Sequence, residues 1–127
     1  METYMPISST TLSATAAAVT LNSIPATFKD LVVRASVRWA SSGYSNLGIR
    51  FNSLSTTIYS RTYLRGDGAA SFSSRGSNQN VIFGENLLQG TSTTASTFSS
   101  VEIYIPSYTA ADSKAVNIFG EPDLERM

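Results

Sequence analysis

The clearest structural signal in the sequence is the stretch LVVRASVRW at residues 31–39. Apolar side chains recur there at every second position, which is the period of a β-strand with one buried face. The side chains expected to face the core are Leu31, Val33, Ala35, Val37 and Trp39. Those expected to face outward are Arg34, Ser36 and Arg38.

The same period of two continues along the chain. Further strands are expected at residues 47–52, 58–64 and 101–105, with weaker ones at 3–12, 19–21, 80–83 and 115–119. We expect a short helical turn at 84–88, and either a loop or a polar edge strand at 91–100. Turn signals rich in Gly, Ser, Asn and Pro separate these runs, among them a turn expected at Arg75 to Asn78. The pattern predicts an all-β protein, an antiparallel β-sandwich of seven to eight short strands resembling a jelly roll.

The length of 127 residues fits one domain. We expect a single β-sandwich domain over residues 1–119 and an acidic C-terminal tail over 120–127. Pro122 should prevent the last strand from continuing into that tail. Area scaling predicts that about two-thirds of the extended chain's surface is buried on folding.

The composition excludes several kinds of chemistry. The sequence has no Cys and no His, so it provides neither disulfides nor a Ser-His-Asp or Cys-His catalytic unit. The sequence contains no Asp-x-Asp-x-Asp run of the kind that forms a calcium-binding loop. We therefore assign no metal or cofactor. Only carboxylate-based glycan cleavage remains compatible with the residues present, and the acids show no obvious pairing for it. The protein is therefore not expected to be an enzyme.

Charge is unevenly distributed along a chain whose net charge is zero. Residues 31–84 carry six Arg against one Asp, whereas residues 85–127 carry six acids against two cations. A pI near 6.2 argues against nucleic-acid binding, which usually needs a strongly basic domain. The longest apolar run near the N-terminus, residues 16–19, is far shorter than a membrane span. The basic middle is better explained by an acidic protein partner or by the acidic end of another copy.

Seven residues are candidates for an interface because Tyr and Arg are enriched at binding hot spots. They are Arg34, Arg38, Arg50, Tyr44, Tyr59, Arg61 and Tyr63. The last three share one face of the strand at 58–64, with Tyr44 in the loop before, and this face could stack against sugars or contact a protein. The alternative, which we favour, is a half-buried face whose Tyr rings cover the sheet while Arg61 extends between them.

Several stretches, in this order, resemble a family of small virion structural proteins of tailed bacteriophages, especially phages of cyanobacteria and other aquatic bacteria. The stretches are residues 4–12, 19–33, 49–52, 59–60, 64–68 and 101–108, and the resemblance covers roughly residues 4 to 119. It implies a β-rich particle protein and transfers no catalytic residue. Many members of the family continue well beyond the stretch that corresponds to residues 105–108, with several more strands. This chain is therefore expected to be either a shortened version or a sandwich completed by a neighbouring subunit.

The resemblance and the composition together predict a capsid decoration (cement) protein. Such a protein is made in the bacterial cytoplasm and located in the virion. The expected partners are further copies of itself, as a homotrimer, and the major capsid protein or other virion proteins. The alternative is a tail fibre or appendage module that binds host surface glycans. No nucleic acid or membrane is expected as a direct partner.

Overall fold

The computed structural model describes residues 4–121, with only the backbone described for Glu121. Within this range the regular structure is entirely β-strand, and every strand pairing is antiparallel. The strands are β1 (Leu31–Val37), β2 (Tyr44–Ile49), β3 (Tyr59–Gly66), β4 (Ser71–Gln79), β5 (Ile82–Gln89), β6 (Ser99–Ile105) and β7 (Asn117–Glu121). The prediction of an antiparallel all-β protein is confirmed for this part of the chain.

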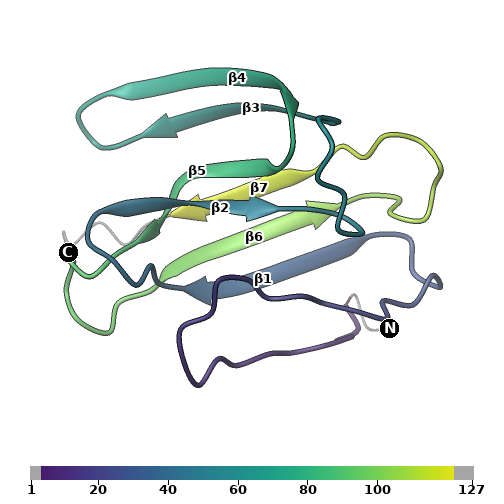
Figure 1. The fold of residues 1–127 in the computed structure, drawn as a ribbon, viewed down its shortest axis with the longest axis horizontal. Coiled ribbons are helices and arrows are strands. Elements are labelled where there is room, and N and C mark those ends of the chain that lie inside the picture. Colours follow the sequence, from purple (N-terminus) through teal and green to yellow (C-terminus); the bar gives the residue numbers. More distant parts are fainter. Residues whose placement is uncertain (1–3, 122–127) are drawn as a thin grey trace.

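The strands form three small sheets (Figure 1). The largest has the order β1-β6-β7, so that β6 is central and β1 and β7 are its edges. Strands β2 and β5 form a second sheet, and β3 and β4 form a hairpin that stands apart from the three-stranded sheet in Figure 1. No element in residues 4–121 is a helix with the length and apolarity that crossing a membrane demands.

The core lies between the three-stranded sheet and the β2–β5 pair. Its most buried members on β6 are Val101, Ile103 and Ile105, which are 2–6% exposed and alternate with more exposed residues as predicted. Leu88 from β5 joins them. The partly buried residues packed against this cluster are Leu31, Val33, Val37, Leu47, Ile49, Phe51, Leu87, Tyr108, Val116 and Ile118. The alternation predicted for the strands at 31–39, 47–52 and 101–105 is therefore confirmed for most of the inward-facing residues, but Ala35 and Trp39 are not part of this cluster.

Apart from shifted strand ends and Tyr44, which begins β2 instead of lying in a loop, four sequence predictions differ from the structure. Trp39 lies beyond the end of β1 and is 41% exposed instead of facing the core. Residues 84–88 belong to strand β5, not to a helical turn, because Gly84 and Leu88 both pair with β2, with an irregularity in the register between them. Residues 71–79 form strand β4, although Arg75 to Asn78 was expected to be a turn. These residues form a strand because they pair with β3, although the pattern of their own side chains does not indicate a strand.

The fourth difference concerns the N-terminal segment. Strands were expected at 3–12 and 19–21, yet residues 4–30 contain no strand, and Thr3 lies outside the described residues. The two runs have suitable side chains but form no backbone hydrogen bonds with any strand, and an unpaired strand is not stable in water. At the other end, β7 runs through Gly120 and Glu121, and the rest of the expected acidic tail lies outside the described residues.

Candidate functional site

Arg34 is paired with an acid of its own chain. It lies on the exposed face of β1 directly opposite Glu102 of β6, and its Nε donates to Glu102 Oε2 at 3.2 Å. Because the two side chains are 66% and 45% exposed, this pair contributes at most ~1 kcal/mol. The Arg34 guanidinium also lies 5.3 Å from the centre of the Tyr4 ring. The basic middle and the acidic end of the sequence thus meet here within one chain.

Arg38 holds the loop between β5 and β6. Its Nη1 donates to the carbonyl oxygens of Thr94 and Thr97 at 2.8 and 2.7 Å, and its Nη2 donates to the Thr93 carbonyl at 3.2 Å. A planar guanidinium with several donors suits such a cluster of carbonyls. Residues 91–100 were expected to form either a loop or an edge strand, and residues 91–98 form a loop. The hydrogen bonds from Arg38 stabilise this loop from within the same chain.

Arg61 forms the more sheltered of the two ion pairs in the described residues. Its Nη1 donates to Glu85 Oε1 at 2.6 Å, and the two side chains are only 18% and 21% exposed. The guanidinium also lies 5.5 Å from the centre of the Tyr63 ring and 5.4 Å from that of the Phe83 ring. Arg61 therefore joins the β3–β4 hairpin to β5 through charge and cation–π contacts. Arg50 is likewise used internally, since its Nε donates to the Asn80 carbonyl at 2.9 Å.

The four residues proposed for sugar or protein contact do not form one exposed surface. Tyr59 is 9% exposed, and its hydroxyl accepts from Phe51 N–H and donates to the Leu54 carbonyl. Tyr63 is half-buried on the same face of β3, as the favoured alternative predicted. Only Tyr44, which is 50% exposed, presents a ring to solvent. An external ligand would meet Tyr44 without the other three.

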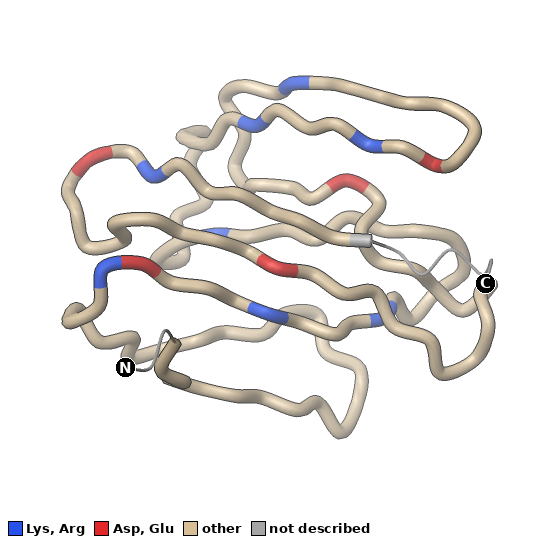
Figure 2. The backbone as a smooth tube through the Cα atoms, turned by 180° about the vertical axis from the view of Figure 1, so that it is seen from behind, with Lys and Arg blue, Asp and Glu red and all other residues tan. Residues whose placement is uncertain are grey.

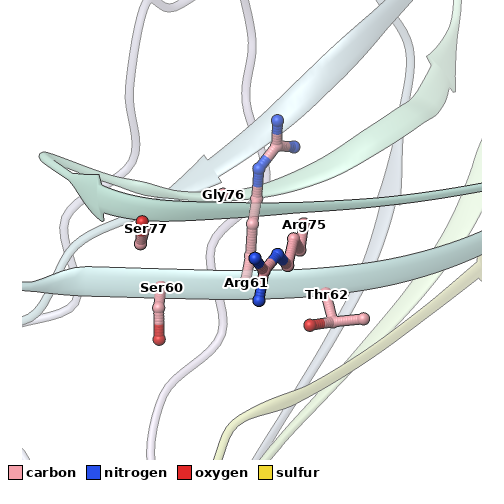
Figure 3. Close-up of a pocket in the computed structure, with 6 residues that line it drawn as sticks. All are labelled: Ser60, Arg61, Thr62, Arg75, Gly76 and Ser77. Carbon is pink, nitrogen blue, oxygen red and sulfur yellow. The ribbon is translucent and has the colours of Figure 1, made fainter.

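A pocket on the β3–β4 hairpin contains two arginines that do not act together (Figure 3). It is lined by Ser60, Arg61, Thr62, Arg75, Gly76 and Ser77. Arg61 is opposite Gly76 in the ladder, and Thr62 is opposite Arg75, so the two guanidinium groups start from opposite faces of the hairpin. Figure 3 shows them pointing in different directions. The pocket therefore lacks the converging charges that an anion site needs.

Asp30 anchors the chain just before β1. Its carboxylate accepts from Ser107 N–H at 2.7 Å and from the Tyr104 hydroxyl at 2.9 Å. The Ser107 backbone hydrogen bond, followed by that from Tyr104, lowers the pKa of Asp30 below its ordinary value. The same hydrogen bond raises the pKa of Tyr104, because losing the phenol proton beside a carboxylate is unfavourable. These contacts fix the start of β1 on the end of β6.

The longest continuous run of exposed residues in the described part of the chain is the segment before this anchor, residues 4–27, which we call the N-terminal arm. Every residue of the arm is exposed, and residues 3–28 contain no charged side chain. In Figure 2 the described part of the arm is without Lys, Arg, Asp or Glu. Its large exposed apolar residues are Tyr4, Met5, Ile7, Leu12, Val19, Leu21 and Ile24. The charge-free run is visible in the sequence, but its local pattern predicts strands of the domain at residues 3–12 and 19–21.

The remaining chemistry of the surface is sparse. Within residues 4–121, no three His, Cys, Asp or Glu side chains come together as metal ligands. Searches against protein-family models, curated proteins and solved structures found no match.

Proposed function

We propose that this chain is a structural, non-catalytic subunit of a phage particle, and specifically a capsid decoration protein. The observation that carries the proposal is the amount of surface left uncovered. The accessible surface is 9515 Å². A compact monomer of this mass would expose only ~6,600 Å². An accessible surface of this extent, on which fifteen large apolar side chains of the described residues are exposed, is expected of a chain that contacts neighbours.

The balance between covered and uncovered apolar groups supports the same proposal. The central core contains four buried residues, Leu88, Val101, Ile103 and Ile105. Outside the arm, the described residues also leave large apolar side chains exposed, including Leu64 at 81% and Phe119 at 63%. The resemblance of residues 4 to 119 to small virion structural proteins agrees with a role in which these side chains contact other subunits.

In this role the chain forms a homotrimer on the capsid and contacts the major capsid protein. Closed cyclic symmetry suits local threefold positions and prevents open-ended growth. The three small sheets would then be parts of a jelly-roll-like sandwich to which neighbouring subunits contribute. Many modest contacts, repeated over the shell, would resist internal pressure. The alternative role as a glycan-binding tail fibre module has less support, because Tyr59, Arg61 and Tyr63 are engaged within the chain.

The resistance of particles to heat tests this proposal. Particles stripped of the protein are expected to release their DNA at a lower temperature than intact particles, because the contacts between shell subunits are fewer. Adding the purified chain back should restore the original release temperature, which controls for damage during stripping. If stripped and intact particles release DNA at the same temperature, the cementing role is wrong.

A further inference from the structure

The arm is attached firmly at its root but weakly along its length. At the root, Phe28 N–H donates to the Tyr108 hydroxyl, which in turn donates to the Pro25 carbonyl. By contrast, no backbone hydrogen bond joins residues 4–24 to any strand. Among residues 4–24 of the described structure, the side-chain interactions found are those of Tyr4, with the Arg34 guanidinium and electrostatically with Tyr104. Little therefore holds the arm to its own domain.

The arm lies beside an edge strand that also lacks a partner. Strand β1 is paired with β6 on one side only, so its other side presents free N–H and C=O groups. Figure 1 shows the arm, the darkest part of the chain, running past this free edge of β1. The hydrogen bonds of Pro25 and Phe28 with the Tyr108 hydroxyl fix the position of the root. With the root in this position, the arm forms no backbone hydrogen bonds with β1. An arm that enters from another molecule is free of this restraint.

We propose that the arm of one copy pairs as a β-strand with the free edge of β1 in a second copy, and that copies exchange arms in this way. Backbone hydrogen bonds to the edge would give affinity, as in other cases of strand addition. Val19 and Leu21 alternate with Thr20 and Asn22, which is the pattern of a strand with one apolar face. The contact of Tyr4 with Arg34 can form between copies as it does within one.

Charge and area both favour a second copy as the occupant. Natural edge strands are usually protected from pairing by charged side chains, and the arm has none. The accessible surface is 9515 Å². Even if ~1,400 Å² of it is assigned to the nine residues outside the described range, ~1,500 Å² remains above the value for a compact monomer. A standard interface needs only ~800 Å² from each partner.

The test is the mass of the purified full chain in solution, measured by light scattering after size exclusion at about 10 µM. We expect an oligomer, and we expect the double variant V19D/L21D to run at the monomer mass with an unchanged β-sheet circular dichroism spectrum. The matched control T20D/N22D adds the same charge on the other face of the strand and should remain oligomeric. A monomeric wild-type chain, or an oligomeric V19D/L21D, would overturn the proposal.

Hydrogen exchange keeps the proposal testable if V19D/L21D does not fold. In the wild-type chain, amides within residues 17–24 should exchange at least ~10-fold more slowly than in the isolated arm peptide, because a paired strand must open before it exchanges. Exchange at the peptide's rate would exclude the strand. The inference rests on the proposed structural role, but it is tested on protein in solution. Its failure would leave the heat resistance of particles unaffected, and a failure of the cementing role would leave the oligomer intact.

Discussion

Replacing Gly90 with alanine is expected to lower the free energy of unfolding by ~2–4 kcal/mol, a large effect for a one-carbon change. Gly90 is buried where the loop after β1 passes the end of β5. A Cβ at this position would lie well inside the contact distance of the carbonyl oxygens of Ser41 and Gly43. The same passage is fixed by hydrogen bonds from Trp39 N–H to the Gln89 carbonyl and from Thr91 N–H to the Ser41 carbonyl. The backbone therefore cannot move away without breaking them.

Urea denaturation of the two proteins measures this effect. The matched control is Gly66→Ala, because a Cβ there meets only the Ala70 carbonyl oxygen at 3.9 Å, an ordinary contact. The control should change the free energy of unfolding by less than ~0.5 kcal/mol. Equal effects of the two substitutions would show that the loop does not pack against Gly90 as described.

Replacing Ile103 with alanine is expected to remove ~2–4 kcal/mol of stability. Ile103 is 6% exposed at the centre of β6 and lies between Val33 of β1 and Ile118 of β7 in the ladders. Truncation would leave a cavity in a core with few buried side chains to fill it. Because all three strands of the largest sheet meet at this position, the loss would affect the whole sheet.

Thermal or urea unfolding can be compared with that of Leu64→Ala, which truncates an apolar side chain that is 81% exposed. This control should stay within ~0.5 kcal/mol of the wild-type chain when the protein is measured as a monomer. A loss at Ile103 no greater than that at Leu64 would contradict the assignment of β6 as the centre of the core.

Local alternation was sufficient to predict the strands that build the core. Val33, Val101 and Ile103 were all placed on the buried side from the sequence, because one face of each strand is apolar and the other is polar. Strand β4 has no such pattern, since all but two of its residues are exposed. It is a strand because β3 lies beside it, and that pairing is not encoded in the side chains of residues 71–79.

The contacts of the candidate residues could not be predicted because their partners are distant in the sequence. The sequence indicated that Arg34 faces outward, but Glu102 stands opposite it only through the register of β1 and β6. Similarly, Arg61 was expected between Tyr rings, whereas its ion pair with Glu85 depends on how the hairpin meets β5. The arm was misinterpreted for the opposite reason, because its local pattern is strand-like while its own chain provides no pairing.

The number of copies per particle tests the proposed role most directly. Purified particles can be digested and the peptides of this chain quantified by mass spectrometry against those of the major capsid protein, with a tail protein of known copy number as the internal control. A decoration protein is expected at hundreds of copies per particle, in a fixed ratio to the shell subunit. A count of a few or a few tens would assign the chain to an appendage, and its absence from particles would contradict a virion role altogether.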